Sequence, residues 1–479
     1  MNSTKILAKN TIILFISYII TYIFGFVYTI YSARYLGAES FGILSFAITL
    51  TTLVSILIDL GLGTLTTREI SRNKSLTEKY LGNIIPIKII LSLIVLFLIF
   101  LMITVSNYNQ QTITVVYILT FSSIFSSFYL FFYSIFQAYE KMEYQSLTQI
   151  LNAILMFIGI LFAINQKDSV ITFACVYLVT SAIIFALTLF LLSWKLIIPK
   201  IHFNFDLWKY LILTAIPLSL IFMFSSTSFR IDTVLISILK GNIAVGYYSA
   251  AYKLFEAFLF IPMVFAASIF PVFSRLHITS KDSLELSYKK TIKYMTIVSL
   301  PITITTTILS NKIIIFFYGI EYGNSIIALK ILFWAIPAIF LTHVFVFLFV
   351  SINKQKLIVK LTFLIMIYNI LLNLIFIPFL SYTGAAITTI ITEVTFLLLC
   401  LFYLSKLICK IEIKEYLFKP LFSSALMGLF LLYSSSTDFN VVLTVFIGII
   451  IYLVTLILLK TFTREDIMLF NRIIDLKGK

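Results

Sequence analysis

Residues 37–47 read GAESFGILSFA, and residues 241–251 read GNIAVGYYSAA. Four small residues of the first segment recur in the second at an offset of 204 residues: Gly37, Gly42, Ser45 and Ala47 correspond to Gly241, Gly246, Ser249 and Ala251. Both segments lie between two long apolar stretches, in the turn that joins a pair of expected helices. This recurrence at the same place in the chain predicts two related helical bundles fused in tandem.

The composition is that of a membrane protein. Hydrophobic residues make up 61% and charged residues 11% of the 479 residues, and the mean hydropathy is +1.08, whereas about a quarter of a soluble domain is charged. Apolar runs long enough to cross about 30 Å of hydrocarbon at ~1.5 Å per residue recur along the chain. We therefore expect an all-α polytopic protein with about fourteen transmembrane helices, at residues 11–33, 41–63, 84–105, 113–137, 147–164, 170–193, 209–238, 243–272, 292–317, 326–352, 357–380, 383–405, 418–435 and 440–459.

The repeat also predicts how these helices are grouped. The offset contains an even number of expected spans, so the second copy has the same orientation in the membrane as the first. We expect two parallel six-helix lobes with a cavity between them, followed by two further helices. The predicted boundaries are 1–200 for the N-terminal lobe, 201–410 for the C-terminal lobe, and 411–479 for the extra helices and a cytoplasmic tail.

The distribution of Lys and Arg predicts the orientation, because short basic loops stay on the cytoplasmic side of a membrane. Most of the 35 basic residues fall in alternate connections, namely 1–10, 64–88, 138–146, 195–209, 274–293, 353–360, 406–419 and 460–479. Both termini are therefore expected in the cytoplasm, with the protein in the plasma or inner membrane. The net charge of +15 is explained by this topology and by attraction to anionic lipids, so no nucleic-acid partner is expected.

Four charged residues fall inside two expected spans. Arg230 and Asp232 lie in the span 209–238, and Lys253 and Glu256 lie in the span 243–272. Each would cost roughly 2.5–3.5 kcal/mol if it faced lipid, so these side chains must face protein or water. Two alternatives remain open: Lys253 and Glu256, at i and i+3, can pair on one helix face, or the basic residues can line a wet cavity.

Two further charged residues lie near span ends. Arg34 follows the first span and can reach the membrane interface, and Asp59 near the end of the second span can accept a proton or cation or make a packing contact. The three cysteines, Cys175, Cys400 and Cys409, form no metal-binding or redox pattern. No metal or resident cofactor is expected.

Several runs of sequence together resemble one family. They are Ala33-Arg34-Tyr35-Leu36-Gly37 through Phe41-Gly42, Asp59-Leu60-Gly61-Leu62-Gly63 followed by Thr67-Arg68-Glu69, Arg230-Ile231-Asp232, Gly246 through Lys253, Phe270-Pro271 with Ser274-Arg275, Trp334-Ala335-Ile336-Pro337, and Gly384-Ala385-Ala386. In order and spacing they resemble the Wzx-type flippases of lipid-linked oligosaccharides, in the multidrug/oligosaccharidyl-lipid/polysaccharide (MOP) exporter superfamily.

The resemblance implies a V-shaped two-lobed bundle that flips an isoprenoid diphosphate carrying a short glycan from the inner to the outer leaflet by alternating access. Since a diphosphate needs a cationic, water-filled cavity, we expect Arg230 and Lys253, together with Arg34, to attract it. Asp232, Glu256 and Asp59 are then candidates for coupling to H⁺ or Na⁺, or for charge pairing. The expected partners are the lipid-linked oligosaccharide, membrane lipids and, as candidates, the polysaccharide polymerase or glycosyltransferase machinery.

Two other functions are alternatives. A cation-coupled multidrug or metabolite antiporter of the same superfamily would share the helical core, although its cavity usually favours cationic ligands. A membrane enzyme such as a glycan polymerase or ligase would need a sizeable outer loop to carry catalytic residues, and the expected connections are short. We therefore expect a carrier and not an enzyme.

Overall fold

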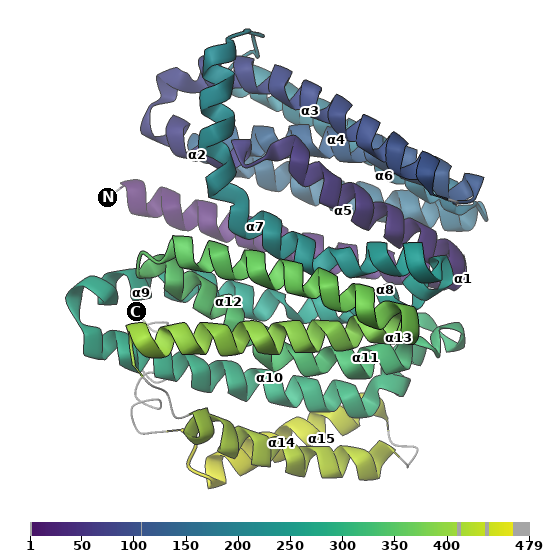
Figure 1. Cartoon of the computed structure of the whole chain (residues 1–479), viewed down its shortest axis with the longest axis vertical. Helices are drawn as coiled ribbons and strands as arrows, with labels where there is room; N and C mark the ends of the chain where they lie inside the picture. The colour runs from purple at the N-terminus through teal and green to yellow at the C-terminus, as the bar shows by residue number, and fades with distance from the viewer. Residues whose placement is uncertain (1, 107, 410–412, 436–439, 463–479) are drawn as a thin grey trace. The chain divides into compact units, whose positions relative to one another are not determined.

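The computed structural model describes residues 2–106, 108–409, 413–435 and 440–462, and every regular element in these ranges is a helix (Figure 1). The long helices are α1 (Asn2–Asp59), α3 (Thr77–Val105), α4 (Gln110–Ala138), α5 (Met142–Asn165), α6 (Val170–Lys195), α7 (Phe205–Lys240), α8 (Asn242–Phe258), α9 (Phe260–Thr279), α10 (Lys281–Tyr318), α12 (Ile336–Ser351), α13 (Gln355–Leu407), α14 (Ile413–Ser435) and α15 (Val441–Leu458). The short ones are α2 (Leu62–Arg72), η1 (Lys74–Leu76), η2 (Ile320–Tyr322), α11 (Ser325–Leu332) and η3 (Phe333–Ala335). The expected cytoplasmic tail lies outside the described residues from 463 onward.

The predicted set of membrane spans is confirmed. Within the described residues, 12 helical stretches are long and apolar enough to cross a membrane. Two of them, Lys9–Asp59 and Gln355–Leu407, are 51 and 53 residues long and bend at Gly37 and Ser381. Since about 20 residues suffice for one crossing, each of these two stretches supplies two spans. The structure thus accommodates the fourteen expected spans.

The two copies of the repeat share one backbone conformation. Gly37 has φ 68° and ψ 175°, and Gly241, its counterpart, has φ 82° and ψ 178°. Only glycine readily adopts this region, because a β-carbon would clash with the backbone. In both copies, therefore, a glycine turns the chain from one long helix into the next.

The chain packs as two compact units, which are described separately. The first unit comprises Met1–Ala250 and Ile370–Tyr382, and the second comprises Ala251–Asn369 and Thr383–Lys479. These units are defined by which residues contact one another. The predicted lobe boundaries at 200 and 410 are defined instead by the repeated segment and the order of the expected spans. The boundaries therefore stay a prediction.

In the first unit, α1 packs against α4 and α5, and α6 packs against both of these helices. A core of buried apolar side chains joins α2, α3, α4, the end of α6 and the start of α7; its members include Leu65, Leu81, Phe132, Leu192 and Leu211. This packing fixes the polar faces of α1, α2 and α4 relative to one another.

The two copies of the repeat also touch within the first unit. A β-carbon added to Gly42 would lie 1.8 Å from the carbonyl oxygen of Asn242, and one added to Gly246 would lie 1.9 Å from that of Ala38. The two contacts are equivalent, since Ala38 and Gly42 correspond to Asn242 and Gly246 at the same offset. The repeated glycines therefore let two backbones approach each other closely, as in other tightly packed membrane helices.

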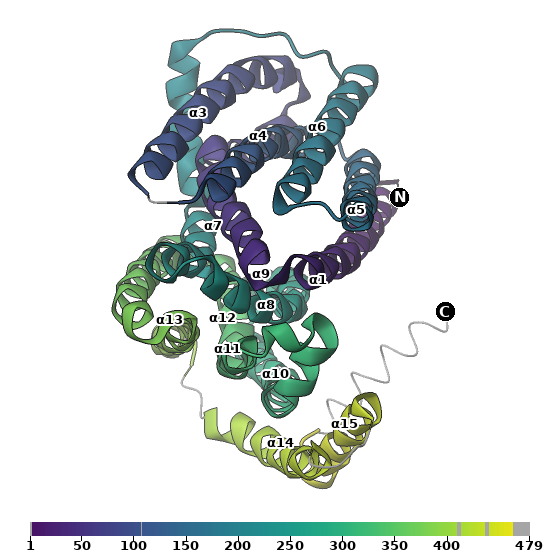
Figure 2. The ribbon, with the colours of Figure 1, turned by 90° about the vertical axis from the view of Figure 1, so that its right-hand side faces the viewer.

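In the second unit, the two C-terminal helices α14 and α15 lie side by side, and α14 also packs against α10 (Figure 2). Buried side chains of the three helices form a small core that includes Leu309, Met427 and Tyr452. The Tyr452 hydroxyl donates a hydrogen bond of 2.7 Å to the carbonyl oxygen of Ile297. The two extra helices are thus an integral part of this unit.

Because the two repeats approach closely, an added methyl group should destabilise the protein at Gly42 and Gly246 but not at a glycine outside this contact. Gly42→Ala and Gly246→Ala should each destabilise the protein by about 1–3 kcal/mol or more, because the new β-carbon overlaps backbone atoms that cannot move aside. Gly25→Ala, also in α1, is the matched control: its β-carbon would meet only the Tyr28 hydroxyl, at 4.0 Å, so it should be neutral or stabilising. Thermal unfolding of the detergent-purified protein measures all three, and equal midpoints would contradict the packing described here.

Candidate functional site

A cavity of about 480 Å³ lies within the first unit, and all of its lining residues belong to that unit. More than half of the lining side chains carry a hydroxyl group: Thr51, Thr52 and Ser55 from α1, Thr64 and Thr67 from α2, Ser122, Ser123, Ser126, Ser127 and Ser134 from α4, Tyr177 from α6 and Ser226 from α7. Ligand-binding pockets typically span about 300–1,000 Å³. The cavity is therefore large enough for a small organic ligand, and hydroxyl groups are the commonest polar groups in its lining.

One face of α4 forms the largest part of the polar wall. Ser123, Ser127, Leu130, Ser134 and Gln137 line the cavity and follow one another at alternating intervals of four and three residues. This spacing places them on one side of a helix. The serines of α4 and Gln137 therefore lie on one face, which Leu130 interrupts.

Most of these hydroxyl protons are already engaged. Several donors bond carbonyl oxygens of their own helix, at 2.8 Å for Thr51 to Ala47, 2.7 Å for Thr52 to Ile48, 2.8 Å for Ser123 to Thr120 and 2.6 Å for Ser134 to Phe131. A hydroxyl that donates its proton retains lone pairs that can accept hydrogen bonds. The wall of the cavity is thus rich in acceptors.

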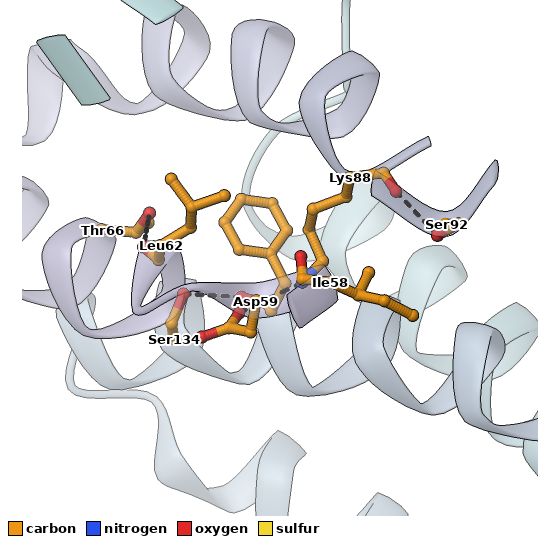
Figure 3. A network of polar contacts seen from close by, with 8 residues as sticks. Ile58, Asp59, Leu62, Thr66, Lys88, Ser92 and Ser134 are labelled. Carbon is orange, nitrogen blue, oxygen red and sulfur yellow. Dashed lines mark hydrogen bonds and ion pairs between the residues drawn. The ribbon is translucent and has the colours of Figure 1, made fainter. Parts of the chain in front are cut away.

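An ion pair lies at the edge of the cavity (Figure 3). The Nζ atom of Lys88 in α3 lies 3.1 Å from Oδ1 of Asp59, a cavity-lining residue, and 3.3 Å from the carbonyl oxygen of Ile58. The Lys88 side chain is 0% exposed, whereas that of Asp59 is 40% exposed. The pair therefore presents a carboxylate to the cavity and holds the cation behind it.

The end of α1 provides the partners for this buried lysine. The helix ends at Asp59 because Leu60 and Gly61 adopt left-handed conformations, with φ 45° and 85°. The last carbonyl groups of a helix have no partner within the helix and carry partial negative charge. Lys88 binds one of these carbonyls together with the adjacent carboxylate, which compensates for the burial of its charge.

Lys88 was not among the predicted site residues; it fell within the basic connection 64–88. The structure places it inside α3, with Phe131 of α4 against it at 5.7 Å from Nζ to the ring centroid. Its immediate neighbours Ile87, Ile89 and Ile90 are apolar. That apolar context was the available signal, since a lysine in such a run needs a buried partner.

Of the predicted site residues, Asp59 lines the cavity. Asp232 in α7 is 2% exposed; its carboxylate accepts hydrogen bonds from the Tyr248 hydroxyl and, at 2.9 Å, from the backbone N–H of Thr233. Arg230 lies one half-turn earlier in α7 and is partly exposed. Asp232 is thus satisfied by neutral donors from α7 and α8.

The remaining predicted residues lie on α1 and α8. Lys253 and Glu256 form an i,i+3 ion pair of 3.2 Å, in which each side chain is 34% exposed. Arg34 is exposed on α1, one turn before the bend at Gly37. The structure therefore brings together Lys253 with Glu256 and Asp59 with Lys88, and neither pair includes Arg230 or Arg34.

Comparison with known proteins agrees with this architecture. The family model described as "Polysaccharide biosynthesis protein" matches residues 7–277, and the MatE model matches residues 217–375. The capsular polysaccharide biosynthesis protein CapF of Staphylococcus aureus is 24% identical over 401 residues, which cover 81% of this chain and 96% of CapF.

Solved structures show the same fold. The lipid II flippase MurJ in an inward closed conformation superposes with a TM-score of 0.76 at 18% identity, covering 93% of this chain and 98% of MurJ. An inward-facing multidrug resistance transporter of the MATE family, within the MOP superfamily, superposes with a TM-score of 0.67 at 16% identity, covering 81% of this chain and 95% of the transporter.

These matches and the apolar helices define a multi-pass membrane protein with the fold of the MOP transporters. The family model covers more than half of the chain, and the chain belongs to the polysaccharide biosynthesis protein family. The resemblance inferred from the sequence motifs is thus confirmed.

Because Lys88 is more buried than Asp59, removing Asp59 should lower the folding stability more than removing Lys88. Asp59→Ala should destabilise the protein by about 3 kcal/mol, since it leaves a buried ammonium without its counter-charge. Lys88→Met should cost less, because the Asp59 carboxylate that remains is partly hydrated. The double variant should be more stable than Asp59→Ala alone. Thermal unfolding of the purified protein checks this order, and a greater loss for Lys88→Met than for Asp59→Ala would contradict it.

Proposed function

We propose that this protein is a flippase that moves isoprenoid-diphosphate-linked oligosaccharide units from the inner to the outer leaflet by alternating access, for the synthesis of a cell-surface polysaccharide. On this proposal it is a carrier and not an enzyme, both termini are cytoplasmic, and polymerase or glycosyltransferase proteins are candidate partners. The observation that carries the proposal is a hydroxyl-lined, charge-balanced cavity in a chain of the polysaccharide biosynthesis family.

The cavity suits the glycan better than it suits the diphosphate. Asp59 carries the only formal charge among its lining residues, and a carboxylate repels phosphate. The diphosphate therefore requires cations elsewhere, and we assign this role to Arg230, Lys253 and Arg34. Arginine and lysine bind phosphate through charge-assisted hydrogen bonds.

Coupling to H⁺ or Na⁺ is assigned to acidic residues of the same helices. Asp232, Glu256 and Asp59 each lie in or at the end of a transmembrane helix, where a carboxylate is retained only with a partner. A proton or sodium ion that replaces such a partner changes the charge of the site and can favour one conformation of a carrier.

The alternative is a cation-coupled drug or metabolite antiporter, which the match of the MatE model to residues 217–375 favours. A cavity for organic cations needs uncompensated negative charge or a wall of aromatic side chains. Here the Asp59 carboxylate lies 3.1 Å from the Lys88 ammonium, and two of the lining residues, Tyr177 and Phe222, are aromatic. These features favour the flippase.

The diphosphate assignment predicts the outcome of two substitutions. Arg230→Ala and Lys253→Ala should each reduce glycan export about 10- to 100-fold, because a lost charge-assisted hydrogen bond is worth roughly 1.5–3 kcal/mol. The measurements are complementation of a flippase-deficient strain and the level of lipid-linked intermediates retained on the inner leaflet.

Lys330→Ala is the control, because Lys330 is an exposed lysine of α11 with no assigned role. It should export normally, and all three variants should reach the membrane in equal amounts. Full complementation by both test variants would refute the diphosphate site, whereas a normal glycan profile after deletion of the gene would refute the flippase function itself.

Coupling predicts a dependence on an ion gradient. Transport of a lipid-linked glycan into reconstituted vesicles should slow at least severalfold when the H⁺ or Na⁺ gradient is dissipated with an ionophore. Asp232→Asn should reduce this dependence, because the amide cannot take up a proton or balance a cation. Transport at an unchanged rate without either gradient would exclude coupling to these ions.

A further inference from the structure

One buried hydroxyl of the cavity wall is left without a partner. Ser127 of α4 lines the cavity and is 6% exposed, and its Oγ atom has no hydrogen-bond partner among the described residues. Buried polar groups are nearly always satisfied, so an exception calls for an explanation such as a missing ligand.

The charge of the site restricts the ligand to a neutral one. The Asp59 carboxylate is balanced by the Lys88 ammonium at 3.1 Å, so the pair contributes little net charge to the cavity. The Asp59 carboxylate, which lines the cavity, would repel an anion. A cation would be attracted only weakly, because the Lys88 ammonium already balances that carboxylate. A neutral polar molecule incurs neither penalty.

The hydrogen-bonding character of the wall identifies the class of neutral ligand. Hydroxyls such as those of Thr52 and Ser123 donate to their own helix and offer only lone pairs to the cavity. The Asp59 carboxylate is likewise an acceptor. A ligand with many hydroxyl donors complements such a wall, and Tyr177 adds an aromatic surface of the kind common in ligand pockets.

We infer that this cavity is the binding site for a sugar residue of the lipid-linked glycan, with Asp59 and Ser127 as its specific hydrogen-bonding groups. The inference rests on the proposed flippase function and adds a division of labour, in which the cavity holds the sugar and the cationic residues outside it hold the diphosphate. The cavity volume of about 480 Å³ lies within the ~300–1,000 Å³ typical of ligand pockets. This is enough for one or two pyranose rings.

Ser127→Ala tests the inference without disturbing the fold. The substitution removes only an oxygen atom that has no partner in the protein, so folding stability should be unchanged or slightly higher. Ser146→Ala is the matched control: Ser146 is a buried serine of α5 in the same unit, its Oγ also has no partner among the described residues, and it does not line the cavity.

The experiment measures binding to the purified full-length protein in lipid nanodiscs. The probes are undecaprenyl diphosphate without sugar and undecaprenyl diphosphate carrying N-acetylglucosamine or galactose, and ethidium serves as the organic cation. We expect the wild type to bind at least one glycosylated lipid more tightly than the bare lipid. Ser127→Ala should lower the affinity for that glycosylated lipid about two- to tenfold, the range expected for one neutral hydrogen bond. The affinity for the bare lipid should not change.

The outcomes separate the inference from the function on which it rests. Equal affinity for bare and glycosylated lipids, or an equal effect of Ser127→Ala and Ser146→Ala, would overturn the sugar site and leave the flippase proposal standing. Binding of ethidium with no binding of any lipid probe would overturn both proposals and favour the antiporter.

Discussion

Two backbones meet at Gly42 and Gly246 with no space for a β-carbon on either side, and the polar part of the first unit is arranged around this contact. From Gly42 the helix α1 continues to Asp59 and carries Thr51, Thr52 and Ser55 into the cavity wall. Because a helix is stiff over this length, the glycine contact sets the direction in which these hydroxyls point. A bulkier residue would displace that wall from the serines of α4.

Placing charge among apolar helices imposes the second constraint on this protein. Several ionisable groups in the spans are held by specific partners: Lys88 by Asp59 and the end of α1, Lys253 by Glu256, and Asp232 by Tyr248 and Thr233. Each arrangement compensates for the free energy lost when a charge leaves water. The net charge of +15 therefore describes the chain as a whole, whereas the cavity is close to neutral.

The polar groups of the cavity belong mainly to side chains that satisfy their own hydroxyl protons within a helix. Serine and threonine that donate to a carbonyl three or four residues back satisfy their own protons within the helix, so they can lie between transmembrane helices without an external acceptor. Their remaining lone pairs add hydrogen-bond acceptors to the cavity wall without adding charge. A hollow lined by such side chains can therefore hold polar groups among closely packed helices.

Several features could be predicted from the sequence because they depend on residues close together in the chain or on composition. The spans follow from apolar length, the repeat from its glycines, and the pairing of Lys253 with Glu256 was one of two open alternatives because i and i+3 share a helix face. The cavity could not be predicted in this way. A serine stripe on α4 is compatible with packing, with a pore or with a ligand site until its neighbours are known.

The sequence by itself determined the class of protein and its helical order, since both follow from how much apolar surface must be removed from water and from the length needed to cross a bilayer. Only the tertiary structure decided which charges meet and which hydroxyls share a cavity. Asp59 and Lys88 are 29 residues apart, and α1, α2, α4, α6 and α7 all contribute to one wall. Such contacts arise from the packing of helices that are distant in the chain, which no local pattern of residues specifies.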